Sequence, residues 1–238
     1  MQAGESRALL HGLWSTDRSL TLLLCLLSLI LFVLEPMGGL GLVGRVLVAA
    51  VFSLALLAGV GAIAGNRRVA IAVGLCFVVP LTTRWVRVWA GGVYLAAYDA
   101  ILSAMFTALL AVVVLALVVR QGPITRHRLE GAVAVYLLIA LSFAFFYEFM
   151  DVRFAGAFQP LVPVDGDVQI LSSRFVYFSL VTLTTVGYGD ITAVHPVARA
   201  AATLEALIGQ LYPAILLARL VSMQLLDHEA NRNRGRMT

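Results

Sequence analysis

The chain has 238 residues, of which 61% are hydrophobic and 13% are charged, whereas a soluble domain has roughly 45–50% apolar and about 25% charged residues. A soluble core of this size cannot enclose so much apolar surface, so the composition excludes ordinary soluble domains and indicates a protein that faces lipid. The net charge of +4 comes from 17 arginines and no lysine. These arginines form short clusters between apolar runs, which is typical of membrane-protein loops rather than of a nucleic-acid-binding face.

Apolar runs in the sequence approach the length of about 20 helical residues that a bilayer requires. They predict an all-α integral membrane protein with six transmembrane helices. The first run has no small-residue cleavage site after it and is interpreted as an uncleaved span. The third is short and is ended by Arg84 and Arg87, unless these two belong to a longer, tilted helix. The six runs are Ser19–Leu34, Leu42–Ala64, Val69–Thr83, Val93–Val119, Gly131–Met150 and Pro196–Leu226.

Arginine placement predicts the orientation, because cytoplasmic loops carry the excess of positive charge. With the N-terminus inside, ten arginines fall in inner loops or tails and four, including Arg84 and Arg87, fall in outer loops. We therefore expect a multi-pass protein of the cell membrane with both termini in the cytoplasm.

The segment between the fifth and sixth runs, residues 151–195, is longer than any other loop. Its first part is polar and acidic, and Ser173–Thr184 is then apolar for twelve residues. As a helix this stretch measures about 18 Å, too short to cross a bilayer. It predicts a re-entrant half-helix, followed by irregular backbone at membrane depth.

That irregular backbone contains Thr184-Thr185-Val186-Gly187-Tyr188-Gly189-Asp190. Unpaired carbonyl groups at membrane depth are tolerated only where they line a cavity or meet a ligand. Alternating glycines allow successive carbonyls to point the same way. A column of carbonyl oxygens can replace the hydration shell of a cation, so the segment predicts an ion-binding site.

These seven residues match the potassium-channel signature, and the chain resembles the prokaryotic six-span tetrameric potassium channels over about residues 131–226. The resemblance implies a passive, K⁺-selective channel and a homotetramer, since each chain supplies one quarter of the carbonyl ring. It implies K⁺ as the permeant ion, with no cofactor, no enzymatic activity and no nucleic-acid partner. The residues expected to coordinate K⁺ are Thr185, Val186, Gly187 and Tyr188.

The resemblance also implies a set of residues that support the filter. Family members sometimes have a glutamate where this chain has Val181, so the bond from that position to the aspartate is absent here. They often have tryptophan where this chain has Tyr177, whose hydroxyl is expected to replace the tryptophan donor. The supporting residues are Thr184, Gly189, Asp190, Tyr177 and Val181.

Two residues of the last span are expected to form a gating hinge. Pro213 cannot donate a hydrogen bond to the carbonyl of residue 209, and Gly209 loosens the helix at the same place. Gly209 is also similar in position to the family's hinge glycine. The alternative is a static kink that serves packing.

Voltage sensing is not expected, because Ile101–Val119 in the fourth run contains no basic residue. Asp99 is expected to pair with Arg84 or Arg87. Glu205, an acid within the last span, is expected to pair with Arg199 or with an adjacent helix.

His195, near the outer mouth, is either an external pH sensor or an ordinary packing residue at a helix start. The alternatives to a selective channel are a weakly selective cation channel and a potassium-transport subunit that needs a partner.

The predicted organisation has a membrane region, a pore and no soluble regulatory domain. The pore comprises a pore helix at 173–184, a filter at 185–189 and an inner helix at 196–226. The predicted divisions are an N-terminal four-helix region at 1–119, a cytoplasmic linker at 120–130, the pore domain at 131–226 and a cytoplasmic tail at 227–238.

Overall fold

The computed structural model describes residues 18–34, 41–62, 67–90, 92–119, 126–159 and 168–234. Helices make up nearly all of this part of the chain, as the apolar runs predict. The first helix is Arg18–Leu34, and its last five residues form the π-helical turn η1, Ile30–Leu34. The remaining helices are α2 (Gly41–Ala62), α3 (Arg67–Ala90), α4 (Val93–Val118), α5 (Arg126–Arg153), α6 (Val168–Leu183) and α7 (Pro196–Arg234).

Five of the described helices are long and apolar enough to cross a membrane, namely α2, α3, α4, α5 and the part of α7 from Pro196 to Arg219. The prediction of a multi-pass α-helical membrane protein is therefore confirmed. The helix Arg18–Leu34 coincides with the first predicted span, but its described part is shorter than the other five. A sixth span and the cytoplasmic placement of both termini stay predictions.

The third predicted span is longer than expected. It does not end before Arg84, because α3 continues as a helix to Ala90 and encloses both Arg84 and Arg87. Arg84 is only 9% exposed. The two arginines therefore do not belong to the outer loops in which the charge count placed them. The alternative of a longer helix is correct, and the reason is that their charges are neutralised inside the bundle.

Helices α5, α6 and α7 also extend beyond their predicted bounds. The half-helix α6 begins at Val168 rather than at residue 173, and it ends at Leu183. Helix α5 begins at Arg126, within the predicted linker, and α7 continues to Arg234, within the predicted tail. The division of the chain into functional regions stays a prediction.

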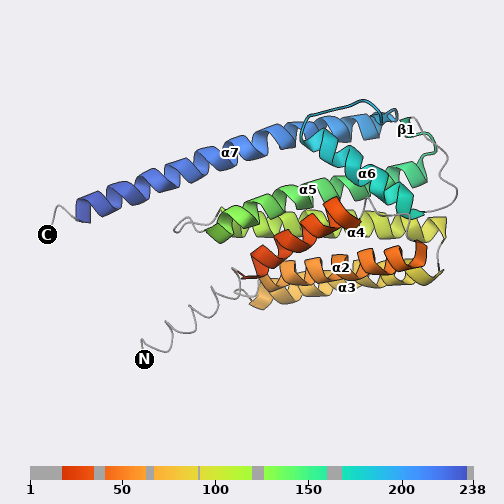
Figure 1. Ribbon diagram of the computed structural model, residues 1–238, viewed down its shortest axis with the longest axis horizontal. Helices are drawn as coiled ribbons and strands as arrows, with labels where there is room; N and C mark the ends of the chain where they lie inside the picture. The colour runs from red at the N-terminus through yellow and green to blue at the C-terminus, as the bar shows by residue number, and fades with distance from the viewer. Residues whose placement is uncertain are drawn as a thin grey trace.

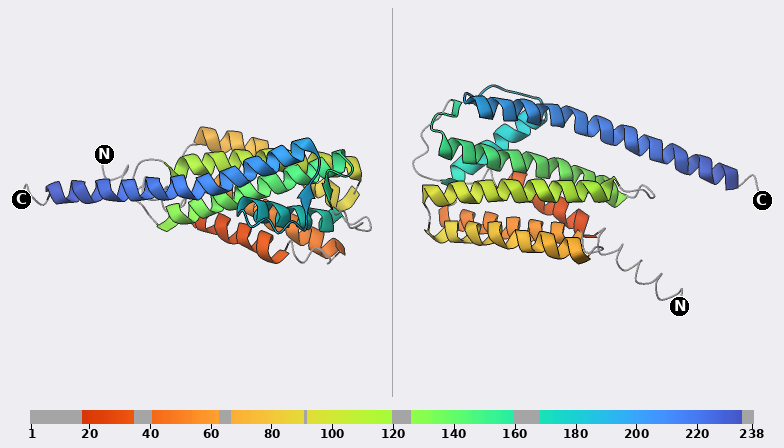
Figure 2. Two further views of the ribbon diagram at one scale, coloured as in Figure 1. Left: turned by 90° about the horizontal axis from the view of Figure 1, so that it is seen from above. Right: turned by 180° about the vertical axis from the view of Figure 1, so that it is seen from behind.

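The helices form a layered bundle, seen in Figure 1 with α2 and α3 at one side, α4 and α5 in the middle, and α6 and α7 at the other. Helix α6 lies obliquely between α5 and α7, and the far half of α7 extends past the bundle, as Figure 2 also shows. Beside α6, the short strands β1 (Phe158–Gln159) and β2 (Thr192–Ala193) pair in antiparallel fashion. This pairing joins the segments that precede and follow α6.

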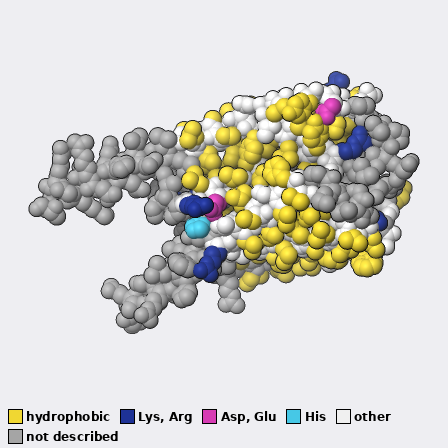
Figure 3. All heavy atoms as spheres, viewed as in Figure 1, with side chains coloured by type: hydrophobic (Ala, Val, Ile, Leu, Met, Phe, Trp, Pro, Cys, Tyr) yellow, Lys and Arg dark blue, Asp and Glu magenta, His cyan; other side chains and the backbone are white. Residues whose placement is uncertain are grey.

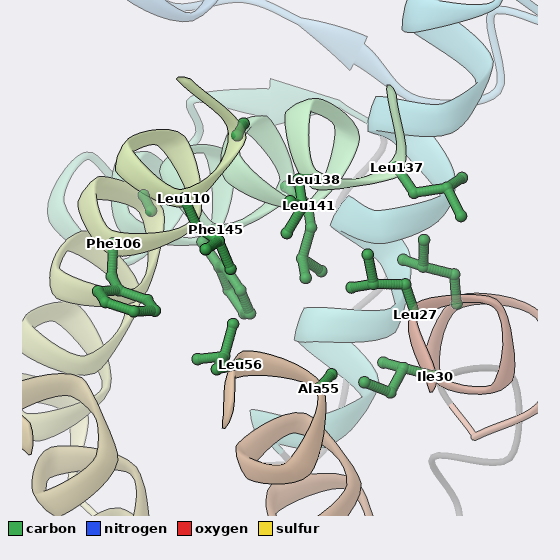
Figure 4. Close-up of a cluster of buried hydrophobic side chains, with 14 of the residues drawn as sticks. Leu27, Ile30, Ala55, Leu56, Phe106, Leu110, Leu137, Leu138, Leu141 and Phe145 are labelled. Atoms are coloured by element: carbon green, nitrogen blue, oxygen red, sulfur yellow. The ribbon is translucent and has the colours of Figure 1, made fainter. Parts of the chain in front are cut away.

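The core connects the N-terminal helices with α5. Figure 4 shows Leu27 of the first helix, Leu56 of α2 and Leu110 of α4 directed toward a row of α5 side chains. The rings of Phe52 and Phe145 meet edge to face with centroids 5.5 Å apart. Burial of this apolar surface holds the N-terminal bundle against α5, which is also the outer helix of the predicted pore.

The outer surface of the bundle is largely apolar. Figure 3 shows hydrophobic side chains over most of the described face, with the visible charged groups toward its ends. Large side chains such as Leu75, Val112 and Leu217 are more than 60% exposed. Such a surface is stable in contact with lipid and unstable in water.

Candidate functional site

The predicted filter follows α6 directly. Helix α6 ends at Leu183, and residues 184–190 have no regular secondary structure. The chain folds back on the helix end, because the carbonyl oxygen of Val181 accepts hydrogen bonds from the N–H groups of Val186 (3.0 Å) and Gly187 (3.3 Å). This double contact was not predicted. It gives Val181 a supporting role through its backbone, whereas sequence reasoning considered only its side chain.

The filter backbone has an unusual conformation. Thr185, Gly187 and Gly189 all have positive φ angles, of 59°, 56° and 78°. Glycine adopts such angles without steric cost, whereas a β-branched threonine rarely does. Among the described residues, none donates a hydrogen bond to the carbonyl oxygen of Thr185, Val186, Gly187 or Tyr188. These four oxygens therefore remain available to a cation.

The outer end of the segment is fixed by Tyr177. Its hydroxyl donates a hydrogen bond of 2.8 Å to Asp190 Oδ2. The other carboxylate oxygen of Asp190 accepts the backbone N–H of Ile191 at 3.1 Å. The hydrogen bond to Asp190 raises the pKa of Tyr177, so the phenol stays protonated and keeps donating at neutral pH.

The inner end of the segment is held by hydroxyl groups. Thr184 Oγ1 donates to the carbonyl of Leu180 at 2.7 Å. Thr185 Oγ1 donates to the carbonyl of Thr184 at 2.7 Å and accepts a hydrogen bond from Gln210 Nε2, also at 2.7 Å. Gln210 lies on α7 and was not singled out from the sequence.

Gly209 lies where α7 crosses the end of α6. A β-carbon at this position would overlap the carbonyl oxygen of Leu183 and would lie 2.7 Å from its carbonyl carbon. Glycine is therefore required for the close approach of the two backbones. Helix α7 runs without interruption through Gly209 and Pro213. The hinge role of these two residues stays a prediction, and the structure adds a packing reason for the glycine.

Glu205 lies fully buried among α5, α6 and α7. It accepts a hydrogen bond of 2.7 Å from the hydroxyl of Tyr147 and also bonds the hydroxyl of Ser179. The expected partner on an adjacent helix is confirmed. Arg199 is the wrong partner, because its Nε donates to the carbonyl of Ala193 at 3.0 Å. Glu205 thus links the three helices of the predicted pore.

A second buried polar cluster lies in the N-terminal bundle and reaches α5. Arg87 donates to Asp99 of α4 at 2.8 Å and to Glu148 of α5 at 2.7 Å, and Arg84 lies 3.5 Å from Asp99. The pairing of Asp99 with these arginines confirms the prediction. Glu148 was missed, although a glutamate within an apolar span is a visible signal.

The aromatic rings of neighbouring helices complete this charged cluster. The guanidinium carbon of Arg84 lies 4.2 Å from the ring centroid of Phe52 and 4.9 Å from that of Phe145. Such cation–π contacts compensate for lost hydration. Two positive and two negative side chains therefore form a neutral connection from α3 and α4 to the outer helix of the predicted pore.

His195 lies at the start of α7. Its ring stacks on Phe154 with centroids 4.6 Å apart, and its Nδ1 accepts the N–H of Val197 at 3.3 Å. Packing at a helix start is thus confirmed, and external pH sensing stays a prediction. The described residues contain no group of three or more His, Cys, Asp or Glu side chains that could hold a metal ion.

Comparison with known proteins places the site within a recognised kind of domain. Residues 133–224 match the family model described as "Ion channel", which identifies this segment as an ion-channel domain and not an enzyme. The chain is also similar to "Protein LctB" of Bacillus caldotenax, with 37% identity over 87 residues. This similarity covers 36% of the present chain and 64% of the relative's length. No solved structure matches the chain.

Proposed function

We propose that the chain is a subunit of a K⁺-selective ion channel, with K⁺ passing along the carbonyl oxygens of Thr185, Val186, Gly187 and Tyr188. The observation that carries the proposal is the signature sequence at 184–190, located after a half-helix and within the segment that matches ion channels. The free carbonyl oxygens of this segment support the same function. Oxygen dipoles replace the hydration shell of K⁺, and ions move between adjacent sites down their electrochemical gradient.

The proposed channel is a homotetramer. One chain supplies one strand of carbonyls, and a closed ring around an ion needs four of them. In the single chain, residues 184–190 are all exposed, as expected for a surface that lines an axis shared with other copies. The four α6 helices would also direct their negative C-terminal ends toward the axis and favour a cation there.

The proposed channel is not steeply voltage-dependent. Moving one charge through the membrane field supplies only about 2.3 kcal/mol per 100 mV, so a sensor needs several mobile charges. The only charged residue of α4 is Asp99, and it is bound to Arg84 and Arg87. A neutral, buried cluster of this kind supports a structural role.

Two alternatives follow from the same features. A weakly selective cation channel would result if the outer end of the filter were loose, but the Tyr177–Asp190 hydrogen bond favours the selective channel. A potassium-transport subunit would conduct only with a partner protein. A flux assay on the purified chain distinguishes these two alternatives, because each predicts a different result.

The test is K⁺ flux into liposomes that contain the purified full-length protein and no other component. We expect uptake driven by a K⁺ gradient, little uptake with Na⁺ in its place, and loss of uptake in Gly187→Ala. Equal fluxes of K⁺ and Na⁺ would support the weakly selective channel. Absence of flux in the wild-type protein would contradict a channel that functions without a partner.

A further inference from the structure

The hydroxyl group of Thr185 is held by a side chain from another helix. Gln210 Nε2 of α7 donates to Thr185 Oγ1 at 2.7 Å, which links the inner end of the filter to the inner helix. No interaction of this kind was predicted, because the two residues are 25 positions apart and a lone glutamine in an apolar helix has no distinctive pattern.

The hydrogen bonds of Thr185 determine the orientation of the Gln210 amide. A threonine hydroxyl has one proton and two lone pairs. Its proton is used in the bond to the carbonyl of Thr184 at 2.7 Å. Thr185 Oγ1 can therefore only accept from Gln210, so the amide must present its N–H group and not its oxygen. One lone pair of the hydroxyl is left for a cation.

The position of Gln210 is fixed by its neighbours on α7. The preceding residue, Gly209, lies directly against the carbonyl of Leu183 at the end of α6. Earlier in α7, Glu205 bonds Ser179 of α6. These two contacts hold α7 against α6 and so fix the position from which the Gln210 side chain reaches Thr185.

We propose that Gln210 is a positioning residue that weakens cation binding at the innermost site of the filter, and this inference rests on the proposed channel function. Its N–H group occupies a lone pair of Thr185 Oγ1 and places the positive end of the amide dipole beside the cation. Conduction requires sites from which ions leave readily. Gln210 thereby speeds the exchange of ions between the filter and the space lined by α7.

The proposal is tested by Ba²⁺ block of K⁺ current through the purified full-length protein in planar bilayers. Ba²⁺ is similar in size to K⁺ and binds oxygen ligands more tightly, so its dwell time reports the affinity of the inner site. Gln210→Leu removes the donor and is expected to lengthen block by roughly three- to tenfold, which corresponds to one hydrogen bond. Gln210→Glu, of equal size, replaces the donor with a negative charge and is expected to lengthen it further.

Two controls separate this role from a general structural effect. Thr203→Val removes a hydroxyl on the same helix that bonds the carbonyl of Arg199 and, among the described residues, no part of the filter, so block is expected to stay unchanged. In a Thr185→Val background, Gln210→Leu is expected to leave the duration of Ba²⁺ block unchanged, because the hydroxyl to which Gln210 donates is absent.

The outcomes distinguish this inference from the proposed function. A wild-type protein that carries no K⁺ current contradicts the proposed function. A K⁺-selective current whose Ba²⁺ block is unchanged or shortened in both Gln210→Leu and Gln210→Glu leaves the channel in place and overturns the role of Gln210. If only the glutamate variant assembles, longer block in that variant supports the proposal, and unchanged or shorter block contradicts it.

Discussion

Replacement of Gly209 by alanine tests whether this residue serves packing. The added β-carbon would lie 2.7 Å from the carbonyl carbon of Leu183, whereas two carbon atoms in favourable contact are about 3.5–4.0 Å apart. The obstacle is backbone and cannot rotate away. Helix α7 must therefore move away from α6 by at least about 1 Å, because this shift restores the carbon–carbon distance and the overlapping carbonyl oxygen needs still more room.

This displacement has a calculable effect on the filter. The Gln210–Thr185 bond of 2.7 Å would lengthen to about 3.7 Å, beyond hydrogen-bond range. Overpacking of this kind costs about 1–3 kcal/mol. We expect Gly209→Ala to lower the thermal stability of the purified assembly by several degrees and to reduce the preference for K⁺ over Na⁺.

Thermal unfolding of the detergent-solubilised protein is monitored by size-exclusion chromatography. Selectivity is measured as the K⁺/Na⁺ permeability ratio. Gly74→Ala in α3 is the matched control, because its β-carbon would meet only Val60 Cγ1, at an ordinary 3.9 Å. A hinge without a packing role predicts that Gly209→Ala changes open probability alone. Wild-type stability and selectivity in this variant would refute the packing argument.

Substitutions at three further positions probe the buried and filter-supporting polar contacts. Arg87→Met removes a partner from two buried carboxylates. This change is expected to cost about 3–5 kcal/mol of stability and to lower the melting temperature markedly. A melting temperature equal to that of the wild type would show that the cluster contributes no stability. Tyr177→Phe removes the donor to Asp190, so K⁺/Na⁺ selectivity measured from bi-ionic potentials should fall. Since the hydrogen bond to Asp190 raises the pKa of Tyr177, this contact should persist at neutral pH, and a loss of selectivity near neutral pH would count against it. Glu205→Leu leaves the Tyr147 hydroxyl unpaired, whereas Ser179 keeps its bond to the carbonyl of Ala140, so the assembly should lose about 1–3 kcal/mol of stability. Glu205→Gln keeps an acceptor for Tyr147 and should melt close to the wild type.

Much of the fold could be predicted from length and apolar pattern alone. The spans from Val93 and from Pro196 began where expected, because a bilayer imposes one length on every crossing helix. The half-helix before Thr184 was recognisable because twelve apolar residues cannot cross a membrane. The predicted end of the third span was wrong. The sequence does not show that Arg87 is paired with Glu148, which lies 61 positions away on another helix.

The filter segment could be predicted from the sequence, but most of the side chains that contact it could not. Residues 184–190 form a local signature, and the family resemblance marks Tyr177 as a hydrogen-bond donor, whereas its partner Asp190 is seen only in the structure. Gly209 was interpreted as a source of flexibility, because a sequence does not show what a β-carbon would meet. Gln210 was missed because its importance depends on the packing of α7 against α6, which is a tertiary contact.

The proposed function requires that four copies of this chain form a K⁺-selective pore without a partner protein. It is tested most directly by the reversal potential of the purified protein in planar bilayers under unequal K⁺ and Na⁺, with Gly187→Ala as the control. We expect a reversal close to the K⁺ equilibrium potential and loss of this selective current in Gly187→Ala. A reversal that does not respond to the K⁺ gradient, or a selective current that is unchanged in Gly187→Ala, would contradict it.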